Sequence, residues 1–334
     1  MSVRIAAAQN ALNRLTGAGL VADGQYGPKT KRAVAAFQAS RGLKADGLLG
    51  PKTYAALGIG NAPSMRTPTI STLPPPPPSG PLAPELTESD PPQTTLYFRM
   101  PLGGQGKAKP LTAVYFPASF QPADTIDCIV WLQGHRPDDA ALSIDRYLSG
   151  KWIPYFKFRE ELNATGRPFV LIAPTLGPKS EAGSLTSPGG FDKWLNRVLS
   201  SLGASGPLAG RAPKIGKLVL ACHSGGGAPM RSAARNTVQF AAALRECWGF
   251  DCLYNSPDPT EWRDWARSNP AKKLFIYWAS TTKPLSAALN AFGLPNVTVQ
   301  NAGTNEHNRV PILHWAERIT GFGGLTPELE MGIS

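Results

Sequence analysis

The sequence is short of long hydrophobic runs and of metal-binding motifs. No stretch approaches the roughly 20 apolar residues that span a bilayer, so we expect no membrane span. Polar side chains interrupt the first twenty residues, so we expect no signal peptide. The export route stays open, with release on cell lysis as one option. No HExxH motif is present, and no cysteine has metal-ligand spacing, so we expect no metal and no cofactor.

Cysteine is scarce, with four residues in the whole chain, at positions 128, 222, 247 and 252. Three of them lie in apolar, strand-like runs, so we interpret the cysteines as buried thiols. A disulfide between Cys247 and Cys252 is the alternative, because the sequence does not fix the distance between their Cα atoms.

The net charge of +11 is unevenly distributed along the chain. Residues 1–61 hold eight Lys and Arg against two acids, a net charge of +6, whereas residues 62–92 have a net charge of −2. Basic surfaces concentrate polyanions. Since no nucleic-acid-binding motif is present, we expect an anionic cell envelope, and not nucleic acid, as the partner.

A nine-residue sequence near the N-terminus occurs twice. ADGQYGPKT at 22–30 returns as ADGLLGPKT at 45–53. In each copy Asp-Gly and Gly-Pro punctuate a tight loop, and the final Thr can cap a helix. Apolar residues recur at helical spacing before the first copy and between the two. The pattern predicts a small three-helix domain over residues 1–61.

This repeat region resembles the peptidoglycan-binding domain type 1 family over residues 1–59, through both loops and the AVAAFQ segment between them. The resemblance implies a groove that binds the stem peptide or the glycan of peptidoglycan without catalysis. The candidate contact residues are Asp23, Gly24, Tyr26, Thr30, Asp46, Gly47 and Thr53. The alternative is that most of these residues only shape the turns.

Residues 62–92 have a different composition. Eleven of these 31 residues are proline, including the run 74–78. Proline-rich chain favours the extended polyproline II conformation and cannot build a core. We therefore predict that this segment is a spacer between two domains.

After residue 93 apolar, strand-like segments alternate with helical ones. Eight strands are expected, at 94–100, 112–118, 128–134, 168–174, 217–223, 248–254, 273–279 and 296–302, and the expected helices include 191–202, 228–236, 285–292 and 312–319. Strands that are apolar on both faces and separated by helices imply a sheet covered on both sides. We predict an α/β fold for residues 93–334, with a mainly parallel sheet and helices on both faces.

One strand-to-helix junction has the composition of a nucleophile elbow. In KLVLACHSGGGAPM, at 217–230, an apolar strand runs into Ser224 and three glycines, and a helix follows. The turn strains the serine backbone, so small residues must flank it at −2 and +2, here Cys222 and Gly226. A glycine-rich turn that serves only packing or phosphate binding is the alternative, although the Lys of a P-loop is absent.

The junction resembles that of the α/β-hydrolase superfamily, and the resemblance extends over residues 93–320. Cys222 departs from the Gly of the common signature, but it is also small. The resemblance implies a catalytic base between the last strand and the last helix, where His307 stands. The other histidines fit this place less well, and His223, on the strand itself, is expected to point to the opposite face of the sheet.

Asp251 is the predicted acid that orients the base. No Asp or Glu lies between Arg267 and Asn305, so the usual position after the seventh strand has no carboxylate. A variant of the fold takes the acid from the end of the sixth strand, where Asp251 stands, and the order Ser, Asp, His matches the fold. Asp258 is the competing candidate, and a purely structural role for Asp251 stays open.

The tetrahedral intermediate of acyl transfer needs backbone N–H donors. Gly225, which follows the candidate nucleophile, supplies one. The second is expected from the loop LQGHRPDD, from the amide of His135 or of Arg136. A simple turn at this loop is the alternative.

Together these features predict a serine hydrolase that acts as a monomer at the bacterial cell wall, most simply on a carboxylic ester. The organisation resembles that of phage mycolylarabinogalactan esterases of the lysin B type, although the elbow Cys-His-Ser-Gly-Gly differs from their Gly-Tyr-Ser-Gln-Gly. The alternatives are a peptidoglycan amide hydrolase, a lipid or polyester esterase, and a non-catalytic wall-binding protein.

Overall fold

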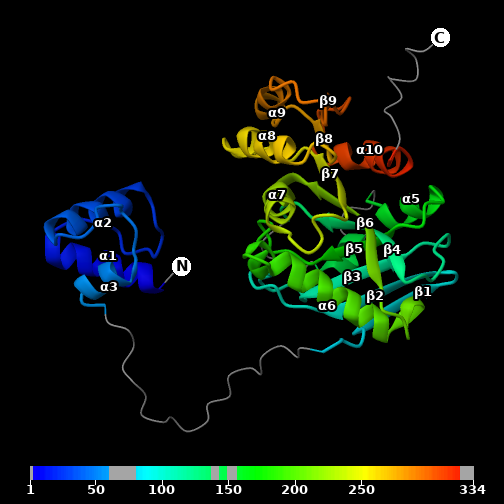
Figure 1. The fold of residues 1–334 in the computed structure, drawn as a ribbon, viewed down its shortest axis with the longest axis horizontal. Coiled ribbons are helices and arrows are strands. Elements are labelled where there is room, and N and C mark those ends of the chain that lie inside the picture. The colour runs from blue at the N-terminus through cyan, green and yellow to red at the C-terminus, as the bar shows by residue number, and fades with distance from the viewer. Residues whose placement is uncertain (1–2, 60–79, 137–142, 149–155, 324–334) are drawn as a thin grey trace, which may run out of the picture. The chain divides into compact units, whose positions relative to one another are not determined.

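The computed structural model describes residues 3–59, 80–136, 143–148 and 156–323. The chain divides into two compact units between Pro76 and Pro77. Figure 1 shows both units, and each is described by itself below. None of the helices in these ranges has the length and apolar character of a membrane-spanning segment.

The N-terminal unit contains three helices, α1 (Val3–Thr16), α2 (Pro28–Ser40) and α3 (Pro51–Ala56). The second and third begin with the proline of a repeated Gly-Pro pair, where the missing N–H costs nothing because the first helical amides have no intrahelical partner. Their apolar faces enclose a small core with Leu12, Val34 and Phe37 at its centre. The predicted three-helix domain is confirmed.

The larger unit is built on one nine-stranded sheet in the order β1-β2-β3-β5-β4-β6-β7-β8-β9. Strands β1 to β3 and the β3–β5 pair are antiparallel, and from β5 to β9 all neighbours are parallel. The strands are β1 (Leu86–Asp90), β2 (Gln93–Arg99), β3 (Leu111–Phe116), β4 (Thr125–Leu132), β5 (Val170–Pro174), β6 (Lys214–His223), β7 (Leu244–Phe250), β8 (Lys273–Trp278) and β9 (Val297–Asn301).

Helices cover both faces of this sheet. One hydrophobic core lies under α6 (Gly190–Ala204), α7 (Gly227–Asn236), α8 (Asp258–Ser268) and α9 (Lys283–Asn290). The other lies under α4 (Ile144–Leu148), α5 (Phe158–Ala164) and α10 (Arg309–Thr320), with α5 and α10 side by side (Figure 1). Alternate residues of β6 enter the two cores, Leu220 on one side and Ala221 on the other. The predicted α/β fold, mainly parallel with helices on both faces, is confirmed.

The structure shortens the predicted spacer at its C-terminal end. Residues 86–90 form strand β1, which pairs with β2, and the amide of Leu82 donates to the Ser201 hydroxyl at 2.9 Å. The edge strand was missed because its sequence, LTESD, has no apolar face, and four of its five residues are exposed. The boundary expected at residue 92 is therefore wrong, and most of the predicted spacer, 62–79, lies outside the described residues.

All four cysteines are buried and free. The predicted buried thiols are present, and the alternative disulfide between Cys247 and Cys252 is not formed.

The parallel strands all end at one edge of the sheet, because parallel neighbours share a direction. The loops after β4, β6, β7 and β9 carry His135, Ser224, Asp251 and His307 respectively. Residues up to 172 positions apart in the chain are thus brought to a single edge, which is where ligands bind in open α/β sheets.

Candidate active site

Ser224 occupies a strained turn between β6 and α7. Its φ is +55°, in the left-handed region that is costly for a residue with a side chain. The glycines around it leave no room for larger residues. A Cβ on Gly226 would lie 2.2 Å from the carbonyl oxygen of Leu132, and one on Gly134 would lie 2.6 Å from Cβ of Ser224. Close approach of the β4 loop therefore holds the turn, and Ser224 itself stays half-exposed.

Asp251 binds His307 through a short contact. The Oδ2 atom of Asp251 lies 2.5 Å from Nδ1 of His307. Its other oxygen accepts hydrogen bonds from the amide of Ala279, at 2.8 Å, and from the hydroxyl of Thr282. Asp251 is 1% exposed, and its φ of +47° is also left-handed. Three neighbouring groups thus fix a buried carboxylate that faces one nitrogen of the imidazole.

The hydrogen bonds keep Asp251 ionised. Burial by itself raises the pKa of the carboxyl, but the hydrogen bonds from His307, Thr282 and Ala279 outweigh burial, and the pKa lies below its usual value. An ionised Asp251 accepts the Nδ1 proton of His307, which leaves Nε2 of the ring free to accept a proton from another group.

His223 lies against His307, which the sequence did not predict. The two rings pack at a tilt of 32° with centroids 4.3 Å apart, and Nε2–H of His223 donates to the backbone oxygen of His307 at 3.2 Å. Burial, followed by the nearness of His307, lowers the pKa of His223 to about 3. His223 does lie on the face of β6 opposite to Cys222. The loop that carries His307 packs on that same face, so the neutral His223 imidazole holds the loop through its hydrogen bond to the His307 carbonyl.

Tyr254 is a second neighbour that sequence reasoning missed. Its phenol oxygen lies 3.3 Å from Nδ1 of His307, and it interacts with the Ser224 hydroxyl. No hydrogen bond joins Ser224 directly to His307 among the residues that the structure describes. A single tyrosine in a loop has no pattern in the sequence that would have revealed this place.

The predicted oxyanion loop lies beside the serine turn, but only part of it is available. A Cβ on Gly225 would lie 2.2 Å from Cδ2 of His135, so the exposed His135 ring covers this glycine. The amide of Arg136 instead donates to the carbonyl of Pro178 at 2.8 Å, and its guanidinium binds the carbonyls of Gln105 and Leu176. The prediction that Arg136 supplies a free N–H is wrong, because the amide is already used.

Ser180 also borders this position. It has a φ of +63° and is 4% exposed, and its hydroxyl has no hydrogen-bond partner within the described part of the chain. The hydroxyl would lie 2.8 Å from a Cβ on Gly225. The chain segment 137–142, which continues the oxyanion loop, lies outside the described residues.

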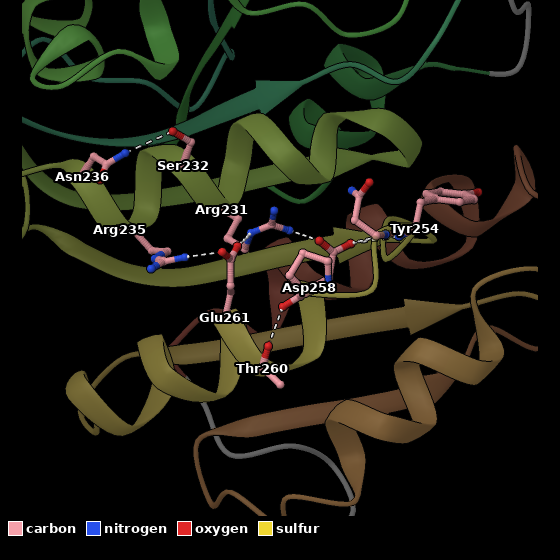
Figure 2. Close-up of polar contacts among 10 residues, drawn as sticks. Arg231, Ser232, Arg235, Asn236, Tyr254, Asp258, Thr260 and Glu261 are labelled. Carbon is pink, nitrogen blue, oxygen red and sulfur yellow. Dashed lines mark hydrogen bonds and ion pairs between the residues drawn. The ribbon is translucent and has the colours of Figure 1, made fainter. Parts of the chain in front are cut away.

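Asp258, the competing acid, serves a different network (Figure 2). Its carboxylate is ion-paired with Arg231 of α7 and accepts the amides of Tyr254 and Asn255, each at 2.9 Å. Arg231 also binds Glu261 at 2.5 Å. Asp258 thus stabilises the turn before α8, and its partners do not include His307.

The remaining features at this edge do not point to a metal. His314 packs in α10, where it stacks on Tyr277 and binds Glu317 at 2.7 Å. The described residues hold no group of three or more His, Cys, Asp or Glu that could bind a metal ion.

A hollow of about 860 Å³ lies away from this edge, beside Leu199, Lys214 and Phe240, and none of the candidate catalytic residues lines it.

The repeated loops of the N-terminal unit are built around two equivalent glutamines. Gln9 accepts the amide of Gly24 and donates to Asp23 and Thr30, whereas Gln38 accepts the amide of Gly47 and donates to Asp46 and Thr53. The phenol of Tyr26 donates to the carbonyl of Gly47. These contacts engage polar groups of all seven predicted ligand residues within the turns themselves, and the part of these residues in ligand binding stays a prediction.

A hollow of about 350 Å³ lies beside the second loop of this unit. Two exposed cations, Lys31 and Arg32, line it together with Asp46 and Gly47. The Asp46 carboxylate accepts the amide of Leu48 and the Gln38 side chain, which lower its pKa. Two exposed cations therefore line the hollow, together with a carboxylate whose Oδ1 already accepts two hydrogen bonds.

Comparison with known families identifies the smaller unit. Residues 2–57 match the family model described as a putative peptidoglycan binding domain. The predicted peptidoglycan-binding domain at the N-terminus is confirmed. No curated protein matched the chain.

Solved structures similar to this chain include three esterases or hydrolases. The feruloyl esterase module from Clostridium thermocellum is 12% identical, with a TM-score of 0.48 over 78% of this chain and 98% of that one. An S-formylglutathione hydrolase from Agrobacterium tumefaciens is 13% identical, with a TM-score of 0.44 over 71% and 98%. A rice cell wall degrading esterase from Xanthomonas oryzae is 10% identical, with a TM-score of 0.42 over 69% and 89%.

Proposed function

We propose that the larger unit is a serine hydrolase that cleaves carboxylic esters, and that the peptidoglycan-binding domain delivers it to the bacterial cell wall. The observation that carries the proposal is the 2.5 Å contact between Asp251 and His307 at the sheet edge where the strained Ser224 turn also lies. A buried, ionised carboxylate, an imidazole and a strained serine at one edge are the parts that acyl transfer requires.

In this mechanism Ser224 Oγ attacks the ester carbonyl carbon while its proton passes to Nε2 of His307. Asp251 holds the imidazole in the required tautomer and stabilises its charged form. The tetrahedral intermediate then collapses, the C–O bond to the alcohol breaks, and the His307 proton goes to the departing oxygen. A water molecule, which gives a proton to His307, then attacks the acyl-enzyme, and the bond to Ser224 Oγ breaks to release the carboxylic acid and the free serine. Hydrogen bonds of this kind often close only when substrate binds, so a Ser224–His307 bond is expected in the complex.

The oxyanion would be held by the amide of Gly225, with the amide of His135 as the second donor. Gly225 lies one residue after the nucleophile, and His135 covers it from the β4 loop. Donors fixed before the reaction stabilise the developing charge without reorganisation. Arg136 has no part in this proposal.

Peptidoglycan binding would keep the enzyme near its substrate. The N-terminal 61 residues carry a net charge of +6, and both of their carboxylates are engaged in turns. The domain therefore presents mostly positive charge to an anionic wall. The proline-rich segment between the units serves as the spacer.

Hydrolysis of p-nitrophenyl esters tests the proposal. We expect the wild type to release nitrophenolate, Ser224→Ala to be inactive, and the matched control Ser232→Ala, on α7 away from the edge, to retain activity. Activity that survives in Ser224→Ala would overturn the assignment of the nucleophile. Inactivity of the wild type on every ester would favour a non-catalytic wall-binding protein.

A further inference from the structure

Tyr254 presents its phenol to the reacting centre. The residue lies three positions after Asp251, and its oxygen lies 3.3 Å from Nδ1 of His307 and interacts with the Ser224 hydroxyl. The residue as a whole is 43% exposed. A donor group thus stands between the proposed nucleophile, the proposed base and solvent.

The buried carboxylate of Asp258 holds the backbone of the turn that carries Tyr254. One oxygen of Asp258 accepts the amides of Tyr254 and Asn255, and the other is ion-paired with Arg231 (Figure 2). Asp258 is 1% exposed, and breaking such a buried pair is costly. The network binds the backbone and leaves the phenol free, so it fixes the ring's position without using its hydroxyl.

The phenol lies on the side of the base. The neighbours of Gly225, the proposed oxyanion donor, are His135 and Ser180, whereas the neighbours of the phenol are His307 and Ser224. In serine ester cleavage the departing oxygen is on the side of the imidazole, because the imidazolium delivers a proton to it. The phenol neighbours the Ser224 hydroxyl as well as His307, so we expect it to come within reach of that oxygen once an ester is bound.

We propose that Tyr254 is a catalytic residue that donates a hydrogen bond to the alcohol oxygen as it leaves. The inference rests on the proposed serine ester mechanism. As the bond from Ser224 Oγ to carbon persists and the bond from carbon to the alcohol oxygen breaks, the proton of His307 passes to that oxygen. Tyr254 keeps its own proton and stabilises the partial negative charge by hydrogen bonding. In the second half of the reaction, the same phenol orients the water that hydrolyses the acyl-enzyme.

The acidity of the phenol suits this role. Burial raises the pKa of Tyr254, and the charge of Asp251 raises it further, against a smaller lowering by Ser224. The raised pKa keeps Tyr254 protonated, and therefore a hydrogen-bond donor, at neutral pH. Tyr254 cannot replace His307 as the proton source, because a phenol of raised pKa does not release its proton.

The dependence of rate on the leaving group distinguishes this role from a structural one. Nitrophenolate leaves without help, whereas a simple alkoxide is far more basic and needs hydrogen bonding and a proton as it departs. The experiment measures kcat/KM for esters of one acyl group with p-nitrophenol, phenol, trifluoroethanol and ethanol. Wild type is compared with Tyr254→Phe, which keeps the ring, and with Tyr115→Phe, which loses a phenol hydroxyl on β3 that binds Gln93.

We expect Tyr254→Phe to lose about tenfold or more in kcat/KM for the ethyl ester, as for loss of a hydrogen bond to developing charge. It should stay within about threefold of wild type for the p-nitrophenyl ester, since that leaving group bears its charge unaided. Tyr115→Phe should leave the slope of rate against leaving-group basicity unchanged. Melting temperatures of the three proteins report any effect on folding.

Two results would overturn the inference. An equal loss for all four esters would assign Tyr254 to structure or substrate binding, and no loss for any would leave its hydroxyl without a catalytic role. Both results keep the proposed function, because Ser224-dependent hydrolysis continues. If instead the wild type cleaves no ester of the series, the proposed function fails, and the role of Tyr254 fails with it.

Discussion

Nδ1 of His307 lies 2.5 Å from a carboxylate oxygen of Asp251, although 56 residues separate the two in the chain. The contact depends on the parallel order of β7, β8 and β9, which brings the ends of the first and last of these strands to one edge. Because Asp251 also binds Ala279 and Thr282, it connects three loops of the candidate site. The pair is therefore both a structural link and the proposed source of base strength.

Replacing Asp251 by Asn should remove the base while keeping the shape of the site. An amide can donate to Nδ1 and thereby favours the tautomer with its proton on Nε2, which cannot accept the Ser224 proton. We expect kcat for ester hydrolysis to fall by roughly a thousandfold or more, with little change in KM. Asp264→Asn, at an exposed position on α8, is the control. A loss below tenfold in Asp251→Asn would argue for a structural role only.

His223 should make the protein sensitive to acid. The folded protein keeps this imidazole neutral down to about pH 3, whereas in the unfolded chain it takes up a proton near pH 6.5. Between these values the unfolded chain binds more protons, so the free energy of unfolding falls as pH drops, by up to about 1.4 kcal/mol per pH unit.

Urea denaturation at several pH values between 7.5 and 4.5 checks this expectation. His223→Gln keeps a donor for the carbonyl of His307 and has no titrating group, so its free energy of unfolding should fall less steeply with acid than that of the wild type. Parallel pH dependences for the two proteins would mean that His223 becomes protonated in the folded state.

Gly226→Ala should destabilise the serine turn. The added Cβ would lie 2.2 Å from the carbonyl oxygen of Leu132, and a backbone atom cannot move aside as a flexible side chain can. We expect a loss of about 1–3 kcal/mol in the free energy of unfolding of the larger unit, together with lower esterase activity. At Gly80 a Cβ meets no atom within 4 Å, so Gly80→Ala serves as the control, and equal stability of the two variants would contradict the packing described for the turn.

The positive charge beside the second repeated loop should support wall binding. Lys31 and Arg32 line the 350 Å³ hollow of the N-terminal unit. We expect the full-length protein with Lys31→Glu and Arg32→Glu to be retained less by purified cell-wall sacculi than wild type in a pull-down assay. Lys107→Glu with Lys109→Glu makes the same change of net charge on the larger unit. Similar retention of both double variants would show that the hollow has no part in binding.

The sequence predicted what local patterns encode and missed what depends on close packing between loops. The eight predicted strands are present because most are apolar runs of sufficient length and the last, β9, has alternating valines, while β1 was missed because LTESD is polar. The absence of acids between Arg267 and Asn305 led to Asp251, which the structure brings to His307. Its catalytic role remains a prediction.

Other parts of the site have no signal in a single sequence. The amide of Arg136 is bound to Pro178, a contact between loops that follow different strands. Asp258, the competing acid of the sequence prediction, instead accepts the amide of Tyr254 and so helps to hold the turn that carries the phenol. Ser180 is distinguished only by its backbone φ of +63° and by a buried hydroxyl without a partner in the described part of the chain, and neither property can be derived from the sequence. The sequence was sufficient to predict which side chains carry the chemistry, but not which hydrogen bonds form between loops.

The most direct test of a serine hydrolase is to locate and time its covalent adduct. The protein is treated with a fluorophosphonate, digested, and analysed by tandem mass spectrometry, with His307→Ala treated in parallel. We predict one adduct on Ser224 in the wild type, formed at least a hundredfold more slowly in His307→Ala. An adduct on another residue, or equal rates with and without His307, would contradict the proposed catalytic pair.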